Sequence, residues 1–109
     1  MSKAPMSTYD AALMLAPSLT PGWCIVCGKP YPTEHHPVKR SHGGTDGPVL
    51  HLCGSGTTGC HGKAESRRLH FRYSPALEMW SYLETREPTK YETTLSLSWW
   101  QFCNREEVA

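Results

Sequence analysis

The sequence has no long hydrophobic run. Its longest apolar stretch, residues 11–16, is too short to cross a bilayer as a helix. Only Lys3 supplies a positive charge ahead of this stretch and no small-residue cleavage site follows it, so a secretory signal is not expected either. We therefore expect no membrane span and a place in the reducing cytoplasm, where closely spaced cysteines and histidines favour metal over disulfides.

Large aliphatic residues are scarce too, and the chain contains no internal repeat or low-complexity segment. A chain of 109 residues with this composition is expected to form one small domain, residues 1–109, in which hydrophobic burial alone gives marginal stability. A bound metal ion that links distant segments would add stability. The five cysteines are the first ligands to examine for that role.

Net charge is small, at +1, but it is unevenly distributed. Residues 29–72 contain seven basic and three acidic residues, whereas the rest of the chain contains four basic and seven acidic residues. The positive middle segment suits contact with phosphate groups, although a solvated face would have the same composition.

Local patterns predict an α+β domain. A short N-terminal helix is expected over residues 7–17, with Ser7 as its N-cap and Pro17 as its end. Two short strands, residues 33–37 and 49–52, flank the Gly-rich loop "SHGGTDG", and a helix opens within "CHGKAESRR". The alternating "RRLHFRY" and the following "EMWSYLE" predict a C-terminal β-hairpin. The tail after Pro88 fits strand and helix spacing equally.

Four of the cysteines form two pairs with metal-ligand spacing. Cys24 and Cys27 enclose two residues, as zinc knuckles do, and Cys53 and Cys60 enclose the six residues "GSGTTG". A loop of Gly, Ser and Thr can bring the second pair of sulfurs to the same ion despite its length. We predict a structural zinc site with no open position, and the plain alternative is four unrelated buried thiols. Cys103 has no partner and is expected to be a simple side chain.

The histidines remain for a second site. Adjacent strand residues point to opposite faces, so His35 and His36 cannot ordinarily bind one ion. One would hold a divalent cation while the other, across a phosphodiester, takes a proton from water. His61 follows a ligand cysteine and is expected near this pair. The alternative is a pair of exposed turn histidines. Loop, packing or surface roles are expected for His42, His51 and His70.

The stretch "EHHPVKRSHGG…VLHLCGSGTTGCHGKAES" resembles the HNH (His-Me finger, ββα-metal) endonucleases, especially the small zinc-bearing members found in bacteriophages and prophages. The resemblance covers about residues 23–68 and rests on Cys pairs, a His pair, Gly-Gly and Cys-His in the family's order. It implies a small ββα-metal domain stapled by a four-cysteine zinc site and flanked by the N-terminal helix and the C-terminal hairpin.

The resemblance also implies roles for single residues. His36 matches the family's general base, and His35 matches the metal ligand before it. His61 matches the closing metal ligand. Glu65 lies one helical turn later, at an offset where some members, such as colicin-type nucleases, have a metal-binding His. The catalytic cation would be Mg²⁺, Mn²⁺, Ni²⁺ or Zn²⁺.

One position departs from the family's pattern. Pro48 stands where the family usually has an Asn that braces the loop behind the general base. A proline supplies neither a backbone donor nor a side-chain amide. Either Asp46 substitutes from the loop or the brace is missing.

The expected function is therefore metal-dependent hydrolysis of DNA phosphodiester bonds by an HNH-type endonuclease. The resemblance implies a phage or prophage protein in a bacterial cytoplasm, with DNA as partner and a packaging terminase or another DNA-processing protein beside it. The alternative function is a non-catalytic zinc-ribbon module that binds nucleic acid or protein.

Trp80, Trp99 and Trp100 are expected in the core or at a partner surface. Sequence-blind phosphate contacts, with solvated charges as the alternative, are expected from Lys39, Arg40, Lys63, Arg67 and Arg68.

Overall fold

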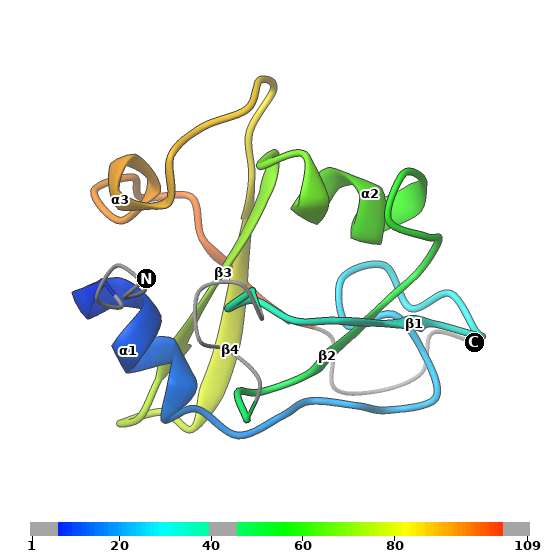
Figure 1. Ribbon diagram of the computed structural model, residues 1–109, viewed down its shortest axis with the longest axis horizontal. Coiled ribbons are helices and arrows are strands. Elements are labelled where there is room, and N and C mark those ends of the chain that lie inside the picture. The colour runs from blue at the N-terminus through cyan, green and yellow to red at the C-terminus, as the bar shows by residue number, and fades with distance from the viewer. Residues whose placement is uncertain (1–6, 40–45, 104–109) are drawn as a thin grey trace, which may run out of the picture.

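The computed structural model of this protein describes residues 7–39 and 46–103. The β3–β4 hairpin runs through the middle of the molecule, with α1 and α3 on one side of it and β1, β2 and α2 on the other (Figure 1). These two small sheets and few helices make the α+β fold that the sequence predicted. In chain order the elements are α1 (Thr8–Met14), β1 (Thr33–His35), β2 (Leu50–Leu52), α2 (Gly59–Glu65), β3 (Leu69–Ser74), β4 (Met79–Glu84), α3 (Tyr91–Thr94) and β5 (Gln101–Phe102).

Helix α1 confirms the N-terminal prediction, although it stops earlier than expected. Ser7 is its N-cap, and the Asp10 N–H donates to Ser7 Oγ at 3.0 Å. The helix buries Leu13 against the core. Just beyond its end, Pro17 O accepts a hydrogen bond of 2.8 Å from Trp80 Nε1, which ties this segment to β4.

The first sheet is shorter than predicted. Strands β1 and β2 are antiparallel, with Glu34 opposite His51 and His35 opposite Leu50. The strand expected over residues 33–37 ends at His35, and the one expected over 49–52 begins at Leu50. Pro37 and Pro48 explain both limits, because a proline has no N–H to donate to a strand ladder.

The second sheet has the strand order β3-β4-β5, with Phe71 opposite Tyr82 in the antiparallel hairpin. The predicted hairpin is thus confirmed, and β5 adds a third strand. The ambiguous tail contains both alternatives, since α3 and β5 are one short helix and one short strand. His70 is buried together with Leu69 and Phe71, because Tyr91 of α3 covers it with a ring centroid 6.2 Å away.

The core joins the two sheets and includes cysteines. Ile25, Leu50 and Leu52 are fully buried, and they belong to the same cluster as Phe71 and Trp80 from the hairpin. This cluster also contains Cys24, Cys53, Cys60 and Cys103. No helix within the described segments is long and apolar enough to span a bilayer.

Candidate metal centres

Four cysteine sulfurs converge between the turn at residues 24–28, β2 and α2. Cys24 and Cys27 flank this turn, in which the Gly28 N–H donates to Cys24 O at 2.9 Å. Cys53 follows β2, and Cys60 lies in the first turn of α2. The four Sγ atoms lie within 4.8 Å of one another, and no cysteine forms a disulfide. The cluster could therefore hold a metal ion, as the spacing predicted.

The loop between Cys53 and Cys60 folds back on itself, which brings the more widely spaced pair together. Gly54 and Gly59 have φ values of +85° and +63°, in the left-handed region that favours glycine. A Cβ at Gly59 would also lie 2.6 Å from Cys53 O. As a result the Cys60 N–H donates to Cys53 Sγ at 3.4 Å, so a backbone donor stabilises charge on this sulfur.

Neighbouring thiols favour a negative charge on Cys24 and disfavour one on Cys60. A hydrogen bond from the Cys60 thiol is the main reason that the pKa of Cys24 is lowered to about 4, against the effect of burial. The same hydrogen bond and burial raise the pKa of Cys60. Desolvation raises the pKa of Cys27. Deprotonation of the other cysteines therefore needs a compensating positive charge. A divalent cation that replaces the thiol protons would provide this charge.

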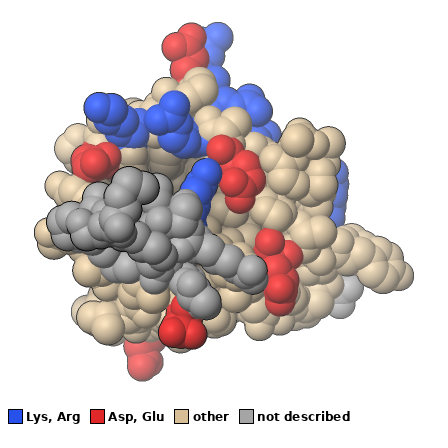
Figure 2. All heavy atoms as spheres, viewed as in Figure 1, with Lys and Arg blue, Asp and Glu red and all other residues tan. Residues whose placement is uncertain are grey.

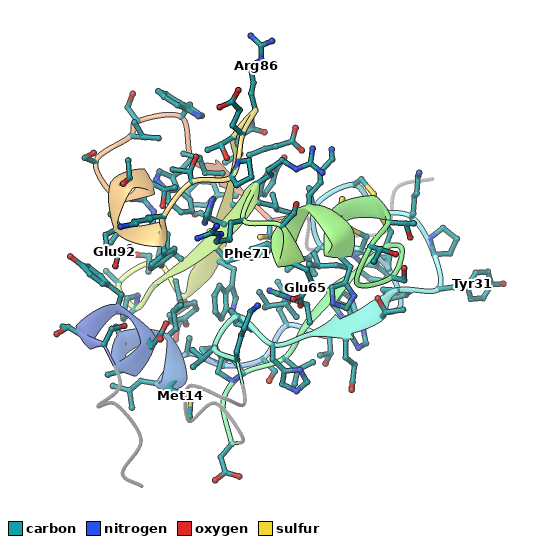
Figure 3. The ribbon with its side chains drawn as sticks, turned by 45° about the horizontal axis from the view of Figure 1, so that its top comes forward. Met14, Tyr31, Glu65, Phe71, Arg86 and Glu92 are labelled. Carbon is teal, nitrogen blue, oxygen red and sulfur yellow. The ribbon has the colours of Figure 1, made fainter. Side chains whose placement is uncertain are left out.

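A second group of ligand atoms lies where β1 meets α2. His35 ends β1, and His61 and Glu65 stand one turn apart on α2. Glu65 Oε1 lies 3.2 Å from His35 Nδ1 and 3.5 Å from His61 Nε2. The three ligand atoms fall within 4.8 Å of one another, and Figure 3 shows Glu65 on the side of α2 that faces β1. The three residues predicted to hold a cation are thus brought together.

The hydroxyl of Thr33 influences which ring nitrogen of His61 carries the hydrogen and which has the lone pair. Thr33 Oγ1 lies 2.9 Å from Gly54 O and 3.2 Å from Leu52 O, and its single hydrogen can be donated to one of these two acceptors. The same oxygen lies 2.7 Å from His61 Nδ1, and it accepts a hydrogen bond from this nitrogen when its own hydrogen goes to a carbonyl. In neutral His61 the lone pair is then on Nε2, directed at a carboxylate oxygen, and these two atoms repel unless a cation or a proton lies between them.

His35 is also suited to ligation. Burial is the main reason that its pKa is lowered to about 4, and His61 lowers it further while Glu65 opposes both. The imidazole is therefore neutral at pH 7, with one lone pair free for a ligand. Its ring packs against Phe71, with ring centroids 6.0 Å apart, which holds the ring in place beside α2.

His36 lies just beyond the end of β1 and is half-buried. It lines a cavity of about 210 Å³ together with His35, Lys39 and Arg67. Lys39 Nζ also lies 3.7 Å from Glu65 Oε2, so a positive charge stands at the edge of the histidine–glutamate cluster. The predicted general base thus shares this cavity with His35, one of the three predicted cation ligands.

The predicted phosphate-binding residues differ in their surroundings. Lys39 and Arg67 line the cavity. Lys63 pairs with Glu84 at 2.8 Å, which raises the pKa of Lys63, and Arg68 Nε donates to Ser66 Oγ at 3.1 Å. Arg40 lies outside the described residues. Lys and Arg side chains lie along the upper part of the face in Figure 2, from the region of α3 across to the end of α2.

Structural positions are taken by His51, His70, Trp80 and Trp100, whereas the Trp99 side chain is exposed. His51 Nδ1 lies 2.6 Å from Pro21 O, and His70 Nε2 donates to Arg67 O at 2.9 Å, so both have the packing roles expected. His42 lies outside the described residues. Trp80 is buried in the core. Trp100 stacks under the Arg72 guanidinium, 4.5 Å from its ring centroid.

The backbone next to Pro48 forms hydrogen bonds with residues 18 and 19, which follow α1. Pro48 is buried and Asp46 is exposed. The Val49 N–H donates to Ser18 Oγ at 2.8 Å, and Val49 O accepts from the Leu19 N–H at 3.0 Å. Segment 18–19 thus supports the start of β2, a contact that the sequence did not suggest.

Sequence reasoning also missed Thr33 and the far wall of the cavity. Thr33 precedes His35 by two residues, so strand alternation could have placed both side chains on one face. Leu13 and Tyr91, which line the cavity from α1 and α3, are too distant in sequence to be found in this way.

Comparison of the chain with protein-family models, with curated proteins and with solved structures finds no match.

Proposed function

We propose that this chain is a metal-dependent DNA endonuclease of the HNH type, in which β1, β2 and α2 form the ββα-metal unit. One observation carries the proposal: the ligand atoms of His35, His61 and Glu65 converge, and His35 also lines a cavity together with His36 and two basic side chains. Hydrolysis of a phosphodiester needs a cation site, a proton acceptor and positive charge in this kind of proximity.

The four-cysteine cluster is assigned to structural zinc. Four soft sulfur donors suit tetrahedral Zn²⁺ and fill every position around it. Cys24 is fully buried and Cys53 nearly so, whereas Cys27 lies at the exposed edge of the cluster. This centre fixes the start of α2 against β2, and so places His61 and Glu65 opposite His35.

The second cluster is assigned to the cation used in hydrolysis. Two imidazole nitrogens and one carboxylate oxygen leave coordination positions open and accept Mg²⁺, Mn²⁺, Ni²⁺ or Zn²⁺. When bound, such a cation would offset the negative charge that develops on the phosphate and the leaving oxygen. The protein's own contribution is to orient the two imidazoles, through Thr33 on His61 and Phe71 on His35.

His36 is assigned as the general base. Its neutral imidazole would accept a proton from the attacking water, on the opposite side of the phosphate from the cluster. Lys39, which borders both the cluster and the cavity, would hold a phosphate oxygen at this position.

Cation dependence tests the proposal. Protein that carries one zinc per chain, in the four-cysteine cluster, should nick supercoiled plasmid when Mg²⁺, Mn²⁺ or Ni²⁺ is added. It should not nick the plasmid when no further cation is added. Glu65→Gln should lower the nicking rate by about tenfold or more, because it removes the anionic ligand, whereas Glu92→Gln, an exposed carboxylate on α3 far from Glu65 in Figure 3, should leave the rate unchanged. Equal rates for Glu65→Gln and the parent protein would contradict the assignment.

A further inference from the structure

The cavity beside His36 extends well past the histidine–glutamate cluster. Lys39 and Arg67 supply positive charge from the segments that follow β1 and α2, whereas Leu13 of α1, Phe71 of β3 and Tyr91 of α3 supply an apolar and aromatic surface, with the Asp10 carboxylate also in the lining. A basic region next to an aromatic wall matches the two halves of a nucleotide, which are a phosphate and a flat base. The volume, about 210 Å³, suits a single such unit and is smaller than a typical pocket for a drug-sized ligand.

Arg67 occupies its position at a conformational cost. Its φ is +62°, in the left-handed region that an arginine rarely adopts. The end of α2 explains this value: the Arg67 N–H donates to Ala64 O at 3.2 Å and the Arg68 N–H donates to Lys63 O at 2.8 Å. These two bonds form the Schellman ending of a helix, in which glycine normally stands at the place of Arg67. A strained arginine where glycine would fit better points to a use for its side chain.

The backbone around Arg67 is also firmly held. Its carbonyl accepts hydrogen bonds from His70 Nε2 and from the Thr89 N–H, both at 2.9 Å. His70 and Thr89 themselves line the cavity, and Tyr91 lies 6.2 Å from the His70 ring. The arginine and the aromatic wall are therefore parts of one braced structure, which preorganises both for a ligand.

We propose that this cavity binds one unpaired nucleotide of the substrate strand, with its phosphate on Arg67 and Lys39 and its base against Tyr91, Phe71 and Leu13. The assignment to a DNA strand rests on the proposed function. A base that enters a cavity cannot remain stacked and paired in a duplex. The preferred substrate class is therefore DNA with unpaired nucleotides at the cutting site, such as a single strand or a flap, rather than a continuous duplex.

Direct binding of a nucleotide tests this site without any cleavage. Thymidine 5′-monophosphate is titrated into zinc-loaded protein in the absence of other divalent cations and followed by amide NMR. The expected shifts are at Leu13, Phe71 and Tyr91, and Arg67→Gly should weaken binding at least tenfold while its melting temperature is equal to or higher than that of the parent. Glu78→Gly is the matched control, because Glu78 also has a left-handed φ, of +52°, but lies in the β3–β4 turn. It should leave nucleotide binding unchanged.

Three results would overturn the proposal. In the first, the parent and Arg67→Gly bind the nucleotide with equal affinity. In the second, the parent binds thymidine as tightly as thymidine 5′-monophosphate. In the third, the parent binds inorganic phosphate as tightly as the nucleotide. The second result would mean that the phosphate makes no favourable contact with the site, and the third would mean that the base makes none.

The two proposals can fail separately. In cleavage assays with Mn²⁺, a flapped oligonucleotide should be cut at least tenfold faster than the same sequence as a continuous duplex. If the nucleotide binds as expected but no DNA is cut, the proposed endonuclease function fails and the nucleotide site stands. If DNA is cut without discrimination and the nucleotide does not bind, the site fails alone.

Discussion

The hydroxyl of Thr33 is the residue-scale feature that sets the chemistry of the second cluster. When it donates to a backbone carbonyl, it accepts from His61 Nδ1, and the Nε2 lone pair of His61 is left facing Glu65. Partners of this kind fix the orientation of metal-ligating histidines and raise their basicity.

Thr33→Val should therefore weaken cation binding without unfolding the protein. Valine keeps the shape of threonine but cannot accept from His61 Nδ1, so we expect about a 10- to 100-fold loss of Mn²⁺ affinity and of nicking rate. The direct readout is the tautomer of His61 by ¹⁵N NMR, which should be Nδ1-protonated in the parent and mixed in the variant. Thr93→Val, at an exposed position of α3, is the control; an unchanged tautomer in Thr33→Val would contradict the argument.

The sequence predicted the ligands at this scale but not their supports. His35, His61 and Glu65 could be chosen from spacing and from the resemblance to HNH endonucleases, and the structure brings them together. The strained φ of Arg67 and the hydrogen bonds of Thr33 depend on how a helix end and a strand meet in three dimensions. No local pattern in the sequence contains that information.

At the scale of elements, α2 connects the two clusters, since it contains Cys60 from one and His61 and Glu65 from the other. Its first turn packs directly on the loop that closes the four-cysteine cluster: the Gly62 N–H donates to Thr58 O at 2.7 Å and the His61 N–H donates to Cys53 O at 3.0 Å. A change at this contact is expected to affect both clusters.

Gly62→Ala should destabilise the protein although alanine normally favours helices by about 1 kcal/mol. A Cβ at Gly62 would lie 2.6 Å from the carbonyl carbon of Thr57 and 2.9 Å from its oxygen, and backbone in a closed loop cannot move away easily. We expect a loss of about 1–3 kcal/mol in the free energy of unfolding, measured with urea. Gly56→Ala, where no atom lies within 4 Å, should change it by less than about 0.5 kcal/mol. A stabilising Gly62→Ala would show that the contact is not tight.

Elements with strong local signals were predicted well, and those limited by prolines or by tertiary contacts were not. Ser7 and Pro17 located α1, and alternation located the β3–β4 hairpin. The strand expected over residues 33–37 was too long because Pro37 ends the ladder. The pairing of β5 with β4 depends on a distant partner, so the tail could not be assigned from its own spacing.

At the scale of the whole molecule, the four-cysteine cluster is continuous with the hydrophobic core. Three of its members, Cys24, Cys53 and Cys60, pack with the leucines of β2. A domain of this size has only a small margin of stability, about 5–15 kcal/mol. Structural zinc contributes a comparable free energy, about 10–16 kcal/mol in small zinc domains. Folding of this chain is therefore expected to depend on the metal.

Cys24→Ser should prevent stable folding and zinc binding together. Serine leaves three thiolates and a buried hydroxyl, so the loss should equal or exceed the total stability, and circular dichroism should show no cooperative melting. Cys103→Ser provides the control, because Cys103 is also buried but lies outside the cluster. It should retain one zinc per chain and lose about 1–3 kcal/mol. If Cys24→Ser melts at the same temperature as the parent, the stabilising role assigned to zinc is wrong.

The most direct test of the account is plasmid nicking by His36→Ala, measured beside the parent protein with Mn²⁺ and with zinc content and melting temperature recorded for both. We predict that the variant folds normally, keeps its zinc and loses nicking activity by at least about 100-fold, as expected for removal of a general base. A zinc-ribbon module that only binds nucleic acid or protein would need no such histidine. If His36→Ala nicks plasmid as fast as the parent, the assigned mechanism is wrong.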